Sequence, residues 1–254
     1  MSYLILKHIR AHRANGLQTH YLAAAAPIFA ASMLGHAIAD RLGVQDQGVA
    51  VIHHRGHLQI DEWPREAPAR AAWQVRGASG PSASPLENPI QPGVLSELDV
   101  SLIIALSRPV DCNEVVGVLQ AMPLRLAGSP IVGLPKIKQT DDAYEALRSC
   151  GRGYVTLDAR SRVQAKLNSG AGILDAMFGH EPDEKGWFVP ATVGYSMLSR
   201  FEGRRNVRDQ LTHAWAEALV GLVEYRSAYR FSASDSLPIW RHRWLDDQTF
   251  VVQQ

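Results

Sequence analysis

The chain has 254 residues, of which 46% are hydrophobic and 20% are charged, and its formal net charge is +1. These fractions are typical of a globular protein and exclude a disordered or fibrous chain, while the charge predicts no bulk attraction to nucleic acid or membranes. Two cysteines exclude a disulfide-built secreted fold and a cysteine-rich zinc ribbon. Because no apolar run is long enough for a membrane span and the first residues lack the order of a signal peptide, we expect a soluble cytoplasmic protein with no membrane partner.

The first half of the sequence alternates between strand and helix patterns. Pro27 opens a helix whose apolar residues recur four apart and which ends at Gly43, and a capping box at Asp111 starts a shorter helix over 113–122. Four strands are expected around these helices, at residues 3–9, 48–60, 98–106 and 124–134. The order strand, helix, strand, strand, helix, strand predicts an α+β, ferredoxin-like fold, in which an antiparallel sheet carries helices on one face.

Residues 61–97 differ in composition from the segments around them. Six of the 14 prolines lie there, together with a glycine- and serine-rich centre. Such a stretch predicts a long loop or thumb inserted between two strands. Trp63 and Trp73 either anchor this excursion and reach outward or fold back onto the sheet, and both arrangements remain open.

The second half is expected to be mainly helical. Helices are predicted at residues 141–149 and 159–177, followed by a hydrophobic turn over 186–190. A longer helix is expected to begin at Asn206, because apolar residues recur from there to Tyr225 at helical spacing, and the tail 232–254 has strand-like patches. We therefore expect a palm over 1–135, with 61–97 as its inserted loop or thumb, and a helical and C-terminal extension over 136–254 packed on it.

Histidines cluster near the N-terminus, but their pattern does not favour a metal site. His53 and His54 are neighbours on an expected strand and so point to opposite faces, which prevents them from converging with His57 on one ion. We expect no metal, no cofactor and no catalytic residue. The alternative is a metal-free ribonuclease, for which His8, His12 and His20 would supply an acid and a base beside Arg10 and Arg13.

Two regions carry groups suited to phosphate. Arg204, Arg205 and Arg208 surround the expected start of the last helix, where three cations are unfavourable unless an anion binds; Asp209 offers the alternative of simple charge compensation. Two turns form the other region. We expect them to lie on one face, with Asn15-Gly16 needing a positive φ at its glycine. The first turn offers Arg10, Arg13, Asn15 and His20, and the second offers Arg125, Gly128 and Ser129.

Several blocks of the sequence resemble one family in collinear order. They are Gly186-Trp-Phe-Val-Pro-Ala-Thr-Val-Gly-Tyr195 with Leu198-Ser199 and Asn206-Val-Arg-Asp209, preceded by Ala14-Asn-Gly-Leu17, Gly48–Arg55 with Gln59-Ile60, Leu98–Ile104 and Leu124–Ser129. The resemblance is to the Cas five-type, RAMP subunit that caps the 5′ handle of the crRNA in type I-F CRISPR surveillance (Csy) complexes. The span 130–185 is shorter than the helical insertion typical of that family, which indicates a compact variant.

The resemblance implies an RRM-like palm with a thumb or web, and RNA binding without turnover. The implied partners are the crRNA handle, the backbone filament subunits, a large DNA-recognition subunit and target DNA in the assembled complex. We therefore expect RNA contacts from both turns and from the arginine cluster with Asn206, and thumb or DNA contacts from Trp63, Trp73 and Arg76. A metal-free endoribonuclease that processes precursor crRNA is the alternative function.

Overall fold

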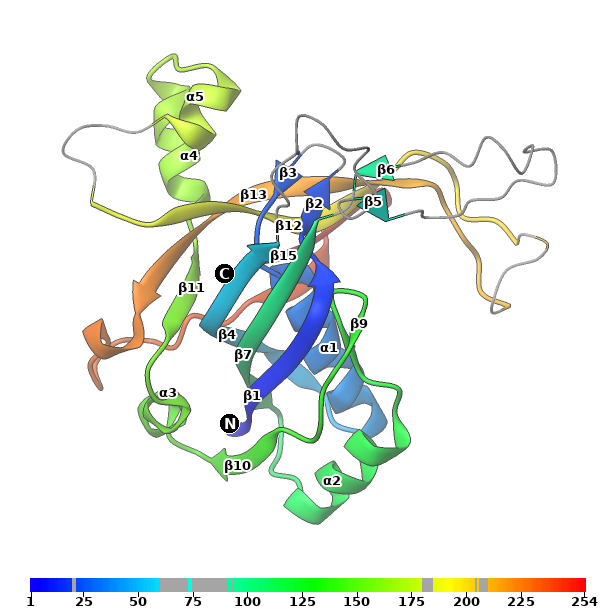
Figure 1. The fold of residues 1–254 in the computed structure, drawn as a ribbon, viewed down its shortest axis with the longest axis vertical. Helices are drawn as coiled ribbons and strands as arrows, with labels where there is room; N and C mark the ends of the chain where they lie inside the picture. Colours follow the sequence, from blue (N-terminus) through cyan, green and yellow to red (C-terminus); the bar gives the residue numbers. More distant parts are fainter. Residues whose placement is uncertain are drawn as a thin grey trace, which may run out of the picture.

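The computed structural model describes residues 1–19, 22–59, 73–74, 91–92, 94–179, 185–203, 205 and 210–254. A nine-stranded sheet runs through this part of the chain, and every pair of neighbouring strands in it is antiparallel (Figure 1). Its strands, in spatial order, are β10 (Lys136–Thr140), β1 (Ser2–Asn15), β7 (Leu95–Leu106), β4 (Asp46–Gln59), β11 (Tyr154–Asp158), β13 (Ala216–Ser227), β12 (Phe188–Met197), β15 (Thr249–Gln253) and β14 (Arg241–Trp244).

The N-terminal half supplies the first four strands in this order and two helices. The chain runs β1, α1 (Ile28–Arg41), β4, β7, α2 (Cys112–Ala121) and β10. Pro27 occupies the N-cap of α1, and Gly43, just beyond its end, has a φ of +61°. The Asp111 side chain caps α2 by accepting a hydrogen bond from the Asn113 amide at 2.9 Å. The expected helices and the first three expected strands are confirmed, and so is the mixed α+β class.

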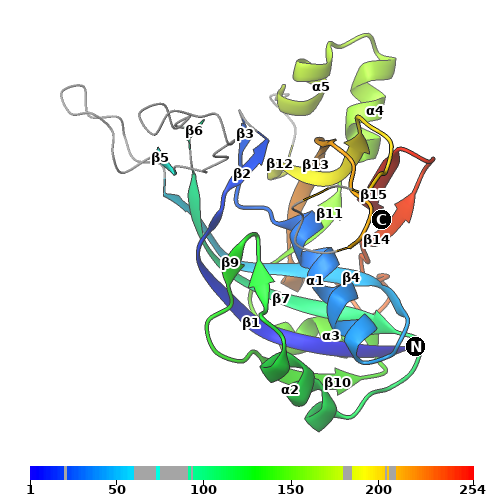
Figure 2. The same cartoon turned by 90° about the vertical axis from the view of Figure 1, so that its right-hand side faces the viewer.

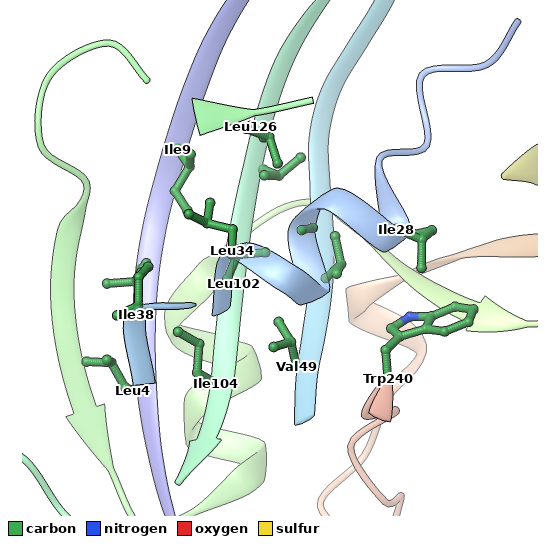
Figure 3. Packing of buried hydrophobic residues seen from close by; sticks show 14 of the residues in the cluster. Leu4, Ile9, Ile28, Leu34, Ile38, Val49, Leu102, Ile104, Leu126 and Trp240 are labelled. Carbon is green, nitrogen blue, oxygen red and sulfur yellow. The ribbon is translucent and has the colours of Figure 1, made fainter. Parts of the chain in front are cut away.

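Helix α1 covers one face of these strands (Figure 2). Leu34 and Ile38 pack over Ile9, Leu102 and Ile104 of the sheet (Figure 3). Each fully buried aliphatic side chain of this kind contributes about 1.5–3 kcal/mol of hydrophobic stabilisation. This packing fixes the position of α1 on the sheet, and therefore the place of its N-terminus.

Helix α3 (Ala143–Cys150) covers one end of the opposite face. Ala146, Leu147 and Cys150 pack against Ile5 and Ile103 there. Burial raises the pKa of the Cys150 thiol to about 12, so this cysteine is a neutral core residue at physiological pH. Toward the other end of the same strands the side chains become polar, beginning at Ser101.

The prediction of a fourth strand over residues 124–134 is wrong. That stretch forms a small hairpin of β8 (Arg125–Leu126) and β9 (Ser129–Pro130), and the strand that pairs with β1 is β10. Ala127 and Gly128 both have positive φ, which reverses the chain tightly before a longer strand can form. Residues 136–140 then pair with Tyr3–Lys7 along the free edge of β1.

The prediction of a last helix from Asn206 to Tyr225 is also wrong in the part that the structure describes. Residues 216–227 form β13, which pairs with β11 on one side and β12 on the other. The apolar run in this segment fits a strand as well as a helix, and pairing on both edges decides between them. The expected turn over 186–190 lies partly in β12. The expected helix over 159–177 is instead two helices, α4 (Arg160–Asn168) and α5 (Ile173–Phe178), and Gly170 between them has a φ of +91°.

The remaining elements are short. The 3-10 helix η1 spans Ala228–Arg230, and two small ladders pair β2 (Leu17–Thr19) with β3 (Leu22–Ala23) and β5 (Trp73–Gln74) with β6 (Gln91–Pro92). Most of the expected 61–97 excursion lies outside the described residues, whereas its last three residues belong to β7. Within the described ranges, no helix has both the length and the apolar character that a membrane crossing requires.

Candidate functional site

The two turns singled out in the sequence lie side by side. The Asn15 amide donates to the Ala127 carbonyl oxygen at 2.8 Å, and the Val132 amide donates to the Arg10 carbonyl oxygen at 2.8 Å. The Ser129 hydroxyl donates to the carbonyl oxygen of His12. These bonds tie the β8–β9 hairpin to the second half of β1, near the N-terminal end of α1 (Figure 2).

A cavity of about 270 Å³ opens where these segments meet. The β8–β9 turn, the end of β1, the start of α1 and strand β12 all contribute to its walls. Its lining residues are Asn15, Leu17, Gln18, Pro27, Ile28, Phe29, Ala30, Ala127, Gly128, Thr192 and Tyr195. The cavity therefore joins both expected turns to strand β12, in which Thr192 is 174 residues from Gln18.

The N-terminus of α1 offers free donors to this cavity. Pro27 makes no side-chain cap, and the first helical bond runs from the Ala31 amide to the Pro27 carbonyl oxygen at 2.8 Å. The amides of Phe29 and Ala30 consequently have no hydrogen-bond partner among the described residues. Uncapped amides at a helix start, with the positive end of the helix dipole, suit a phosphate or another anion.

Strand β12 supplies an aromatic wall. The rings of Tyr195 and Phe29 meet edge to face with centroids 5.0 Å apart, and both are partly exposed. The wall is held to β2 by Thr192, whose amide donates to Gln18 Oε1 at 2.8 Å and whose hydroxyl donates to the Gln18 carbonyl oxygen at 2.7 Å. A partly exposed tyrosine beside free amides is chemically suited to stack on a base whose phosphate the amides hold.

Asn15 lies in this cavity, and its side chain also shapes the local backbone. Its Oδ1 accepts from the Leu17 amide at 3.2 Å, and its Nδ2 donates to the Leu17 carbonyl oxygen at 3.3 Å. The expected positive φ at Gly16 is wrong. A Cβ at Gly16 would lie 2.8 Å from Leu58 Cδ2, at the end of a flexible side chain. The left-handed residues of β1 are His8 and Arg13, with φ of +56° and +57°.

The arginines of the two turns differ in their partners. Arg10 is 61% exposed, and its Nε lies 3.5 Å from Asp99 Oδ2, so part of its charge is compensated. Arg125 is exposed and donates to the Gly128 carbonyl oxygen at 3.1 Å, across its own turn. Arg13 is exposed and its backbone amide donates to Glu97 Oε1 at 3.3 Å, but within the described ranges no ion pair joins the guanidinium of Arg13 or of Arg125 to a carboxylate. Both arginines belong to segments that meet at the cavity, and a guanidinium group is well suited to bind phosphate.

The polar end of the sheet holds the histidines considered for ribonuclease chemistry. His8 Nδ1 lies 2.9 Å from Asp99 Oδ1, and His12 bonds to Glu97, whose pKa this hydrogen bond lowers. His54 lies 2.6 Å from the Ser101 hydroxyl through Nε2, and burial lowers its pKa. Both candidate histidines of β1 are thus engaged by carboxylates.

His53 lies on the other side of the sheet from His54, as expected. Its ring centroid is 5.4 Å from that of Tyr225, and its Nε2 is buried without a hydrogen-bond partner. Burial lowers the pKa of His53 to about 4, so the imidazole is neutral at physiological pH. His53, His54 and His57 do not converge, because His53 is buried and His57 is exposed.

The structure describes only part of the remaining expected site. Arg205 is exposed, and Trp73 belongs to β5. His20, Trp63, Arg76, Arg204, Asn206 and Arg208 lie outside the described residues. Sequence reasoning missed the start of α1 and Thr192 with Tyr195, although both of the latter belong to the Gly186–Tyr195 block.

Comparison with known protein families gives a match in the second half of the chain. Residues 154–250 match the family model described as CRISPR-associated protein (Cas_Csy2). None of the curated proteins matches the chain. The matched segment begins at β11, ends in β15 and supplies Thr192 and Tyr195 to the cavity.

Proposed function

We propose, on the premise that the chain belongs to the Cas_Csy2 family matched by residues 154–250, that it holds the crRNA 5′ handle as a non-catalytic subunit of a type I-F CRISPR surveillance complex. One observation carries the assignment of the binding surface. The two N-terminal turns and the family-matched strand β12 meet around a single cavity, although they lie far apart in the sequence.

The groups around the cavity fit a nucleotide with its phosphate. The Phe29 and Ala30 amides receive phosphate oxygens at the start of α1, while Tyr195 stacks on a base. Arg13 and Arg125 bind phosphates on either side, since both are exposed and their guanidinium groups form no ion pair with a carboxylate in the described part of the chain. The protein thereby fixes the backbone and shape of the handle, and base pairing of the adjoining guide reads the target DNA.

The palm of this subunit is the unit β1–α1–β4–β7–α2–β10. Its strand order β10-β1-β7-β4 with two crossing helices supports a ferredoxin-like, RAMP-type assignment, with the boundary after Thr140 instead of residue 135. The segment between β4 and β7 is where a thumb would leave the palm. The remaining surface, from β11 onward, is available to filament subunits and to a large DNA-recognition subunit.

We infer a non-catalytic role from the state of the candidate groups. His8 and His12 are bonded to Asp99 and Glu97, and the Ser101 hydroxyl beside His54 is buried. Incubation of the protein with repeat RNA in EDTA should leave the RNA intact. Site-specific cleavage under these conditions, lost in His8→Ala or His12→Ala, would establish the ribonuclease instead.

The binding assignment is tested with handle RNA and with a scrambled RNA of equal length. Arg125→Ala should weaken binding to both RNAs and reduce the slope of log K against log salt by about one contact. Arg108→Ala is the matched control, because Arg108 is an exposed arginine just beyond the opposite end of β7 from the cavity. Equal affinities and slopes for the two variants would place the RNA elsewhere.

A further inference from the structure

We propose that His36, Asp46 and His242 form a zinc-binding site that is separate from the RNA cavity. Their potential ligand atoms all lie within 4.8 Å of one another. His36 Nδ1 is 2.9 Å from Asp46 Oδ1, and His242 Nδ1 is 3.8 Å from Asp46 Oδ2. Neighbouring ligands of a tetrahedral zinc ion, each about 2.0–2.1 Å from the metal, lie roughly 3.3 Å apart, so small rotamer changes bring these atoms into a coordination shell.

The ligands come from three elements whose mutual positions are fixed by close packing. His36 follows Gly35 on α1, where a Cβ would lie 2.4 Å from Val49 Cγ2, so α1 approaches β4 as closely as a glycine allows. At Gly48, whose φ is +110°, a Cβ would lie 2.5 Å from the Trp240 carbonyl oxygen. These two approaches bring Asp46 to the helix on one side and to the C-terminal segment on the other.

The C-terminal ligand is held by a fixed backbone. Val49 and Trp240 exchange two backbone hydrogen bonds of 2.9 Å, and the Trp240 indole nitrogen donates to the Thr156 hydroxyl at 3.1 Å. His242 lies two residues after Trp240, at the second position of β14. Ligands on packed helices and strands lose little freedom when they bind a metal, which favours a defined site.

The ligand set and its exposure suit zinc. Two imidazoles and a carboxylate are common zinc ligands, and a three-ligand set leaves the fourth position to water. The Asp46 carboxylate is only 7% exposed, whereas the His36 and His242 side chains are 45% and 28% exposed. The carboxylate is therefore buried against two histidines, and solvent still reaches the imidazoles so that an ion can enter and keep a water.

The potential ligand atoms of a second group, His8, His54 and Asp99, also lie within 4.8 Å of one another. The side chains of this group, however, already bond to other protein groups. His54 uses Nδ1 for the Arg152 carbonyl oxygen and Nε2 for Ser101, each at 2.6 Å. Asp99 is shared by His8 and Arg10. A metal there would have to displace these bonds, whereas in the described part of the chain the ion pairs of His36 and His242 are those to Asp46, inside the proposed site.

Zinc at this position would fasten the C-terminal hairpin to α1. It would also bear on the RNA cavity, because the Phe250 ring lies 5.9 Å from that of His242 and 6.0 Å from that of Phe29, which lines the cavity. Binding of the metal does not depend on the proposed function, since it needs no RNA.

The test is a zinc titration of the full-length chain after removal of metals with a chelator. Wild-type protein should bind one zinc ion per chain, and cobalt(II) in its place should give the visible absorption of a tetrahedral site. His36→Ala with His242→Ala should lower zinc affinity by more than about 100-fold, because loss of a supporting second-shell group alone costs about 10–100-fold. His57→Ala, an exposed histidine on β4, should bind like the wild type.

Two further measurements distinguish loss of zinc binding from misfolding, and this site from the His8, His54 and Asp99 group. The single variant His242→Gln, checked for folding by circular dichroism, should lose the zinc-induced rise in melting temperature that the wild type shows. Absence of stoichiometric zinc in the wild type overturns the proposal. Equal zinc affinity in the wild type and the double variant, or loss of the site in His8→Gln instead, overturns it as well.

Discussion

Acid should destabilise this protein through one buried histidine on β4. His53 is 6% exposed, its Nε2 has no hydrogen-bond partner, and its pKa falls from 6.5 to about 4 on folding. Between these two pH values the unfolded chain binds a proton that the folded chain does not, so the free energy of unfolding decreases as the pH falls through this window. One pKa unit corresponds to about 1.4 kcal/mol, and the full window corresponds to about 3 kcal/mol.

The assay is urea unfolding at a series of pH values from 7 to 4, on the wild type and on His53→Gln, which keeps a polar side chain but removes the titration. The wild type should lose about 3 kcal/mol more than the variant across this range. His57→Gln serves as a control, because it removes an exposed histidine from the same strand. If wild type and His53→Gln lose stability equally, another group controls the acid response and the reasoning about His53 is refuted.

Three further predictions concern the cavity and the packing that places it. Asn15→Ala should reduce the preference for handle RNA over scrambled RNA, because it removes both the turn to Leu17 and a base-reading amide; unchanged preference in a filter-binding assay would leave Asn15 a purely structural residue. Tyr195→Ala should weaken RNA binding by about 1–3 kcal/mol while Tyr195→Phe keeps most of the affinity, as stacking requires, and equal losses in both variants would argue against stacking. Gly35→Val should lower the free energy of unfolding by about 1–3 kcal/mol, since its side chain meets Val49, whereas Gly117→Ala in α2 has open space and should raise it by about 0.5–1 kcal/mol; urea unfolding of both variants checks this contrast.

The elements that the sequence predicted correctly carry their signals locally. Pro27 and Gly43 mark both ends of α1, and the Asp111 cap marks the start of α2. Strands β1, β4 and β7 are long apolar segments between turn residues. Each of these signals is complete within a few residues, so no knowledge of distant pairing is needed to read it.

The elements that were missed depend on partners far along the chain. The helical spacing from Val207 to Tyr225 is real, but residues 216–227 gain hydrogen bonds on two edges, from β11 and β12, which a local pattern cannot reveal. The same holds for β10, whose short polar sequence becomes a strand because the edge of β1 is open to it. Long-range pairing, and not propensity, decides both segments.

The candidate site was also predictable only in part, because it depends on contacts between segments that are far apart in the sequence. The two N-terminal turns were expected to converge, and the bond between Asn15 and Ala127 brings them together. The start of α1 and Tyr195 complete the cavity through tertiary contacts that the sequence does not display. The family resemblance is confirmed by the match over residues 154–250, while the earlier blocks that contributed to it lie outside the matched residues.

The most direct test of RNA-handle binding is to sequence the RNA that copurifies with the protein from cells that express it with its CRISPR array. We expect short RNAs that share one repeat-derived 5′ segment and differ in the guide that follows, and we expect them to be lost when Arg13→Ala and Arg125→Ala are combined. Recovery of RNA without a common 5′ segment, or of no RNA above the background of an untagged control, would contradict this expectation.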